Sequence, residues 1–351
     1  MRGLQVTVLL VSTLLVAGRV CADSKDVLDN TKVVFLTRFL EDHPLDKQAP
    51  PVRAALIQWE ADSKDVVDIV CPGVFAPLPD DSIKFNSELL AQFIFGSAAH
   101  QLAIPADKGK LLPAQLAGMV SMLKTYRTLL ADNKEARIPR FDELLRSEAD
   151  GSLANVLEPL VIANCLPKQT GKTRFPWTFG MSRAQVSGVD GNGPYRSFSN
   201  GDLETYNAVF DGHLQNFQFF FHGDRLERIG IYTFEGTDLS GAVVAWGNLY
   251  DSMQRDFGTV TTPANMPPMA GDAATMTAFE ARAQALVEQS GKTQMAPVHQ
   301  PADARSFASF SRYVVQGTTT YYITLYFDPP GERAGIKPVR AGKGIRVDPA
   351  N

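Results

Sequence analysis

The spacing of apolar residues changes once along this chain, near Pro167. Before this proline, apolar side chains recur at intervals of three and four residues, as in Val33, Leu36, Phe39 and Leu40. This is the period of amphipathic helices, whereas the short aromatic and β-branched runs that follow are typical of antiparallel strands. The sequence therefore predicts an α+β fold: an N-terminal all-α helical bundle followed by an antiparallel β-sheet domain with packed helices.

The chain of 351 residues is long enough for two domains. We expect a helical domain over residues 23–166, an exposed linker over 167–174 and an α+β antiparallel-sheet domain over 175–328. Residues 329–351 are rich in Pro, Gly, Lys and Arg and have no apolar period, so a disordered tail is expected there.

Six apolar stripes with helical spacing predict the helices of the first domain, and several of them follow a proline, a residue favoured in the first helical turn. The stripes begin at Val33, Val52, Leu89, Leu116, Phe141 and Leu153. The run from Val66 to Cys71 is β-branched and fits either a strand or a helix end. The carboxylate pairs Asp80-Asp81 and Glu41-Asp42 stand in loops or at helix ends, where we expect them to be solvated.

Three two-residue turn signals divide the segment from Tyr195 to Phe234 into short strands, which predicts a four-stranded antiparallel meander. The signals are Asn200-Gly201, Asp211-Gly212 and Gly223-Asp224. Neither face of this meander is cleanly polar. We therefore expect a sheet that is covered on both faces, by a helix on one face and by the helical domain on the other.

The rest of the second domain reads as two helices and a hairpin. The first helix spans residues 238–257, with Asp238 or Ser240 as its N-cap and Gly258 as its stop. Its apolar stripe comprises Val244, Trp246, Leu249, Tyr250, Met253 and Phe257. A second helix is expected over residues 273–289, and a hairpin over 306–327 that turns at Gln316-Gly317.

The first 22 residues have the pattern of a secretory signal peptide. Arg2 is followed by the apolar run from Val6 to Ala17, and Val20-Cys21-Ala22 fits a small-x-small cleavage site. The apolar run is shorter than the roughly 20 residues that a bilayer span needs. We expect a periplasmic or secreted protein, cleaved near Ala22, with no transmembrane span in the mature chain. A lipid-modified Cys21 and an uncleaved anchor are the alternatives.

Cleavage would leave two cysteines, Cys71 and Cys165. An even number of cysteines in an oxidising compartment predicts a disulfide between them. The alternative is a pair of buried free thiols, since cysteine is among the most buried residue types.

No motif of catalysis or ligand binding is complete. The Gly-Lys-Thr triplets at 171–173 and 291–293 lack the earlier glycine of a phosphate loop, and Asp190-Gly191-Asn192-Gly193 departs from a calcium loop at Pro194. No pair of histidines has the spacing of a helical zinc site; they are His43, His100, His213, His222 and His299. We therefore expect no catalytic, cofactor-binding or metal-ligating residues and no cofactor.

The charge balance argues against nucleic acid as a partner. Loss of Arg2 and Arg19 with the leader moves the net charge from −4 to −6, and the predicted meander has no basic stripe. Its many aromatic residues fit a platform for stacking sugars or single strands, but such residues on a small sheet more often form the core.

The segment from Phe175 to Gly258 opens with Trp177 and Phe179-Gly180-Met181-Ser182 and ends in a helix with Leu249-Tyr250 and Phe257-Gly258. It resembles the helix-plus-sheet module of outer-membrane-assembly lipoproteins and of β-lactamase-inhibitor proteins. That resemblance implies a module that binds other proteins and catalyses nothing. The helical half resembles only uncharacterised bacterial exported proteins.

These observations favour a secreted or periplasmic non-catalytic protein that binds a protein or cell-envelope component. The alternative is an exported hydrolase acting on envelope or carbohydrate material, which would need a cleft with converging carboxylates or histidines. A carrier with an apolar cavity for a small ligand is a third reading. The oligomeric state is left open.

Overall fold

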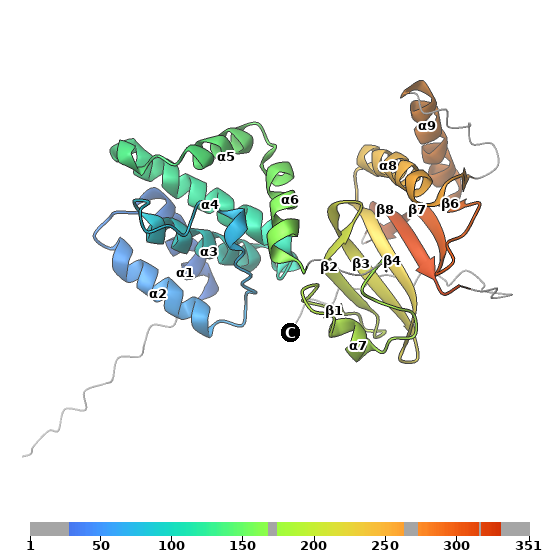
Figure 1. Ribbon diagram of the computed structural model, residues 1–351, viewed down its shortest axis with the longest axis horizontal. Coiled ribbons are helices and arrows are strands. Elements are labelled where there is room, and N and C mark those ends of the chain that lie inside the picture. Colours follow the sequence, from blue (N-terminus) through green and yellow to red (C-terminus); the bar gives the residue numbers. More distant parts are fainter. Residues whose placement is uncertain (1–27, 168–173, 263–272, 316, 331–351) are drawn as a thin grey trace, which may run out of the picture.

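The computed structural model describes residues 28–167, 174–262, 273–315 and 317–330. Helices occupy the first of these stretches, and an antiparallel sheet with packed helices occupies the rest, so the predicted α+β class is confirmed (Figure 1). The predicted signal peptide, most of the linker and most of the tail lie outside the described residues.

Each of the six apolar stripes forms a helix. The helices are α1 (Asn30–Asp42), α2 (Ala49–Asp62), α3 (Asn86–Ala103), α4 (Leu111–Asp132), α5 (Pro139–Ala149) and α6 (Leu153–Cys165). Prolines stand in the first turn of α2 and α5, as expected. The ambiguous run from Val66 to Cys71 is neither strand nor helix but an extended connection. We call residues 28–167 the helical region.

The core of the helical region centres on α4, the longest of these helices. Met119, Met122 and Leu123 on α4 are fully buried. Tyr126, also fully buried, packs edge-on against Phe141 of α5 with 5.4 Å between ring centroids. Amphipathic stripes alone would bury these side chains against one another, so packing and sequence pattern agree.

A disulfide closes the helical region on itself. Cys71 and Cys165 are bonded at an S–S distance of 2.01 Å, with their Cα atoms 5.4 Å apart. The bond joins the residue that precedes a short 3₁₀ turn (Pro72–Val74) to the last residue of α6. The predicted disulfide is confirmed.

The expectation that Glu41 is solvated is wrong. Glu41 is 8% exposed, and its carboxylate accepts hydrogen bonds from Ser121 Oγ at 2.5 Å and Lys124 Nζ at 3.2 Å. A helix-end carboxylate can be buried when its oxygens gain such donors, and here the donors come from α4, far away in the sequence.

The second part of the chain forms one eight-stranded antiparallel sheet in the order β1-β2-β3-β4-β8-β7-β6-β5. The strands are β1 (Arg196–Ser197), β2 (Leu203–Phe210), β3 (His213–His222), β4 (Arg225–Gly236), β5 (Val260–Thr261), β6 (Lys292–Pro297), β7 (Arg305–Val315) and β8 (Thr318–Asp328). The predicted meander is β1 to β4, and the predicted hairpin is β7 and β8. The short strands β5 and β6 were not predicted, because neither has a clear alternation of apolar residues.

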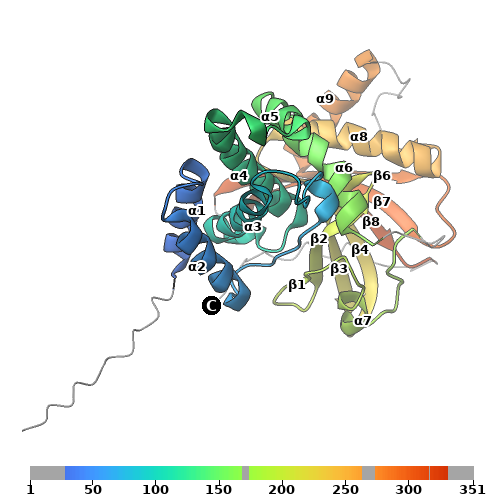
Figure 2. The ribbon, with the colours of Figure 1, turned by 60° about the vertical axis from the view of Figure 1, so that its left-hand side comes forward.

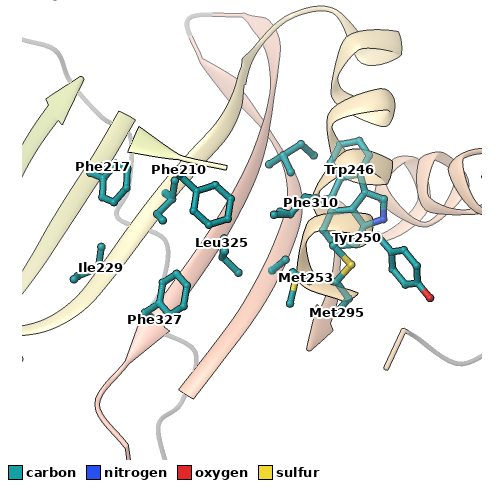
Figure 3. Close-up of a cluster of buried hydrophobic side chains, with 14 of the residues drawn as sticks. Phe210, Phe217, Ile229, Trp246, Tyr250, Met253, Met295, Phe310, Leu325 and Phe327 are labelled. Atoms are coloured by element: carbon teal, nitrogen blue, oxygen red, sulfur yellow. The ribbon is translucent and has the colours of Figure 1, made fainter. Parts of the chain in front are cut away.

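One face of the sheet is covered by helices. The helices of this part are α7 (Arg183–Ser187), α8 (Leu239–Phe257) and α9 (Ala273–Ser290). Phe217 and Ile229 of the sheet point to the same core as Trp246 and Met253 of α8 (Figure 3). The faces follow the strand alternation: Phe217, Phe219, Ile229 and Ile231 point to this core, whereas Tyr232 lies on the other face.

The ends of α8 are as predicted, and so is its apolar stripe from Trp246 to Phe257; the exception is Val244. Asp238 caps the helix by accepting from the amides of Ser240 and Gly241, and Gly258 ends it with a φ of +79°. Val244, predicted to face inward, is 50% exposed, while its neighbour Val243 is 8% exposed. The apolar stripe of α8 is therefore one position away from the predicted one at this turn.

The helical region contacts the sheet at β1, β2 and β3. Arg196 of β1 donates to the carbonyl of Ala106, and the amide of Leu214 on β3 donates to Glu158 of α6 at 2.8 Å. Figure 2 shows α6 beside the meander, and α6 contacts β3, whereas α8 contacts β4 and β8. The helical region thus meets the second face of the sheet at β1, β2 and β3, as expected.

Candidate functional site

A cavity of about 460 Å³ lies where the start of α4 meets the sheet. Its walls come from both parts of the chain, far apart in the sequence. The lining residues are Lys110, Leu112 and Pro113 from the helical region, and Tyr206, Leu214, Gln215, Asn216, Tyr232, Thr233, Phe234 and Glu235 from the sheet. We call this cavity the interdomain cleft.

Asn207 on β2 fixes one wall of the cleft to the other. This side chain is 1% exposed. Its Oδ1 accepts from the amide of Leu111 at 2.9 Å, and its Nδ2 donates to the carbonyls of Gly109 at 3.0 Å and Gly193 at 2.7 Å. A buried side-chain amide with all these partners holds backbone from both parts of the chain in one arrangement.

Two cations flank the ring of Tyr206 at the edge of the cleft. Lys110 Nζ lies 4.2 Å from the ring centroid and also pairs with Asp107 at 3.1 Å. The Arg196 guanidinium lies 5.7 Å from the same centroid and donates to the carbonyls of Ala106 and Lys108. Both cations thus have partners of their own besides the ring.

Two carboxylates stand on the same face of the sheet: Glu235 lines the cleft, and Glu204 lies behind the lining residue Asn216. Glu204 is 8% exposed and accepts from Asn216 Nδ2 at 3.4 Å. Burial raises the pKa of Glu204, while Arg196 and a hydrogen bond from Tyr206 act against that rise. Glu235 lies at the mouth of the cleft and is exposed. Desolvation by the cleft walls, followed by the charge of Glu204, raises the pKa of Glu235, and Lys110 opposes this effect.

The tyrosines of the cleft remain protonated at neutral pH. Burial and the charges of Glu204 and Glu235 raise the pKa of Tyr206 above its ordinary value. Burial likewise raises the pKa of Tyr232, which packs edge-on against Tyr322 at 6.2 Å between centroids. These phenols can donate hydrogen bonds and present ring faces, but they are poor proton acceptors.

Asn216 contributes an unsatisfied polar atom to the cleft. The residue is 7% exposed, and its Nδ2 donates to Glu204, which fixes the orientation of the amide. Its Oδ1 is buried and has no hydrogen-bond partner in the described part of the chain. A buried acceptor of this kind is costly unless something binds to it.

The residues weighed from the sequence lie elsewhere. His213 and His222 stand at opposite ends of β3, as expected. His213 pairs with Glu158 at 2.9 Å, and His100 pairs with Asp107 at 3.0 Å. Among the described residues, no group of three or more His, Cys, Asp or Glu side chains could hold a metal ion.

Sequence reasoning missed the residues that line the cleft. Tyr206 lies on β2, and Tyr232 and Glu235 lie on β4; the meander pairs both strands with β3 as predicted, but the pairing of β4 with β8 was not predicted. The one usable signal was alternation, because Glu204 and Tyr206 on β2 alternate with the core residues Leu203 and Thr205. The aromatic residues divide between two roles, since Phe217 and Phe219 form the core while Tyr206 and Tyr232 line the cleft.

None of the helices in the described stretches has the length and apolarity that a bilayer crossing requires. Comparisons with protein-family models, with curated proteins and with solved structures found no match for this chain. The resemblance of residues 175–258 to outer-membrane-assembly lipoproteins and β-lactamase-inhibitor proteins therefore stays a prediction.

Proposed function

We propose that this chain is an exported protein that binds a protein or cell-envelope component in the interdomain cleft and performs no chemistry of its own. The supporting observation is the cleft itself: aromatic rings, the unpaired amide oxygen of Asn216 and the carboxylate of Glu235 line a cavity between two parts of the chain. Cavities at such junctions, with apolar walls and a few placed polar groups, are common binding sites.

Export is supported by two independent features. The first 22 residues have the composition of a cleaved leader, and the two cysteines that remain form a disulfide. Disulfides persist in oxidising compartments such as the periplasm and the exterior of the cell. A periplasmic or secreted location, with cleavage near Ala22, fits both features.

Capture from an envelope extract tests the proposal. The exported chain, residues 23–351, is immobilised beside the variant Glu235→Arg, which reverses a charge at the mouth of the cleft. We expect the wild-type chain to retain a partner that Glu235→Arg loses at least tenfold. Glu288→Arg is the matched control, because Glu288 is exposed on α9, on the opposite side of the sheet. Equal capture by all three chains, or by none, contradicts the proposal.

A second candidate function rests on the two carboxylates. Glu204 and Glu235 lie on the same face, and the pKa of each is raised. A protonated carboxyl near an ionised one is the arrangement used in glycoside hydrolysis. An exported hydrolase of this kind would turn over envelope or carbohydrate material and lose at least a hundredfold in rate with either Glu204→Gln or Glu235→Gln.

A further inference from the structure

The interdomain cleft presents two hydrogen-bond acceptors, the amide oxygen of Asn216 and the carboxylate of Glu235. Asn216 Oδ1 is buried without a partner in the described part of the chain, and the Glu235 carboxylate is exposed in the lining of the cleft, with the buried Glu204 on the same face of the sheet. The nearest cations are already engaged, because Lys110 pairs with Asp107 and Arg196 donates to backbone carbonyls. A ligand for this cleft should therefore bring donors and positive charge.

Ammonium and guanidinium groups have both properties, since they donate hydrogen bonds and accept none. They also bind to the faces of aromatic rings, and Tyr206 already shows this contact with Lys110 at 4.2 Å. Tyr232 and Phe234 contribute further rings to the lining of the cleft. The chemistry of the cleft thus matches a chain segment that carries Lys and Arg side chains.

Residues 331–351 of this chain have that composition. They contain five basic residues, Arg333, Lys337, Arg340, Lys343 and Arg346, against the acidic Glu332 and Asp348. The segment is net positive, while the whole chain carries −4, so the remainder is net negative. Charge complementarity of this kind directs and orients association.

The segment is also long enough to reach the cleft. It follows β8, which ends at Asp328, and Glu235 pairs with Tyr322 of the same strand. From Asp328 back to Tyr322 is a distance of roughly 20 Å at about 3.3 Å per residue. An extended chain of this segment's length spans up to about 70 Å.

We propose that the interdomain cleft binds the chain's own C-terminal segment, residues 331–351, through its Lys and Arg side chains. This rests on the proposed function, because the segment then competes with an external partner for the same site. The partner would share the segment's chemistry and present ammonium or guanidinium groups to Glu235 and Asn216.

The test uses the full exported chain and a neutral-tail variant, in which the five basic residues of the segment are replaced by Gln. A fluorescent peptide of residues 331–351 should bind to the neutral-tail variant and at least tenfold more weakly to the wild-type chain, whose cleft is occupied. Adding Glu235→Arg to the neutral-tail variant should weaken peptide binding at least tenfold, whereas adding Glu288→Arg should leave it unchanged.

Carbodiimide coupling gives a direct readout in the wild-type chain. We expect an amide between Glu235 and Lys337 or Lys343 within one chain, at a yield independent of protein concentration, and none from Glu288. Links that join two chains, or peptide binding that ignores Glu235→Arg, overturn the inference. If the peptide fails to bind while a partner is still captured through Glu235, the inference falls and the proposed function stands. If the peptide binds through Glu235 while no partner is captured, the inference stands and the proposed function falls.

Discussion

Arg228 on β4 and Asp328 on β8 form a two-point ion pair between residues 100 positions apart in the sequence. Nε lies 2.6 Å from Oδ1, and Nη2 lies 2.9 Å from Oδ2. The guanidinium also contacts the rings of Phe307 and Tyr326, at 5.4 Å and 5.1 Å from their centroids. This pair ties the meander to the C-terminal hairpin on the same face as the cleft.

Removing this guanidinium should destabilise the chain. Arg228→Ala leaves Asp328 buried without its cation, and we expect a loss of about 2 to 4 kcal/mol in the free energy of unfolding. Arg228→Lys should recover only part of the loss, because an ammonium cannot make the two-point contact. Urea titration followed by circular dichroism measures both. Arg225→Ala is the control, since Arg225 is exposed on the same strand. If Arg225→Ala lowers the free energy of unfolding as much as Arg228→Ala does, the ion pair is not the cause of the loss.

Asn207 should couple the two parts of the chain. Asn207→Ala leaves the amide of Leu111 and the carbonyls of Gly109 and Gly193 without partners, and we expect a loss of about 2 to 3 kcal/mol. Asn207→Asp keeps the size and the acceptor but places an oxygen against two carbonyls, so it should cost at least as much. Hydrogen exchange at the Leu111 amide should be faster in both variants. Unchanged exchange would mean that other contacts hold the cleft walls.

Stability should fall as the pH rises from about 4.5 to about 8. Burial, followed by the charge of Asp68, raises the pKa of Glu60 from 4.5 to about 8. Within this window the folded chain holds a proton that the unfolded chain has lost, so rising pH favours unfolding. Glu60→Gln removes this dependence and should stabilise the chain at pH 8 by about 1 to 2 kcal/mol, an amount reduced because the side chain is only half-buried.

Thermal unfolding between pH 4 and pH 9 checks the Glu60 prediction. Asp62→Asn serves as the control, because Asp62 is exposed at the end of the same helix. Its profile should match that of the wild-type chain, and an equal flattening by both variants would contradict a specific effect of Glu60.

Val243 and Val244 provide a matched pair on α8. Val243→Asn places an amide in the core and should cost about 2 to 4 kcal/mol, whereas Val244→Asn should change stability by less than about 0.5 kcal/mol. Chemical denaturation distinguishes the two. The reverse order would support the stripe predicted from the sequence, in which Val244 faces inward.

The disulfide should contribute measurably to stability. Replacing Cys71 and Cys165 together by Ser should cost about 2 to 4 kcal/mol, because the cross-link restricts the unfolded chain. Reductant should lower the melting temperature of the wild-type chain and leave the double variant unaffected. A wild-type chain that melts at the same temperature with and without reductant would show that the bond does not form.

Local sequence patterns predicted most of the helices and strands. They did not predict the cleft, because its walls are brought together by pairings between residues far apart in the sequence. The helices and the meander follow from spacings within ten or twenty residues and from turn signals such as Asp211-Gly212. The pairing of β4 with β8 places Glu235 opposite Tyr322. The hydrogen bond from the amide of Leu111 to Asn207 joins the helical region to the sheet. Such long-range pairings decide which polar residues share a surface.

The sequence pattern also failed to predict whether some individual side chains are buried or exposed. Glu41 stands at a helix end, where carboxylates are commonly solvated, yet Ser121 and Lys124 reach it from α4. Val244 fits the period of its helix, but the packing of α8 on the sheet buries Val243 instead. In both cases the partner element, which lies elsewhere in the sequence, determines the environment.

The bond between Cys71 and Cys165 has a further consequence for the intact molecule. These residues are 94 positions apart, and α3, α4 and α5 lie between them. A protease that cuts the backbone once anywhere within this span yields fragments that stay attached through sulfur. The damaged molecule would therefore keep its mass, apart from one added water, until a thiol releases the pieces.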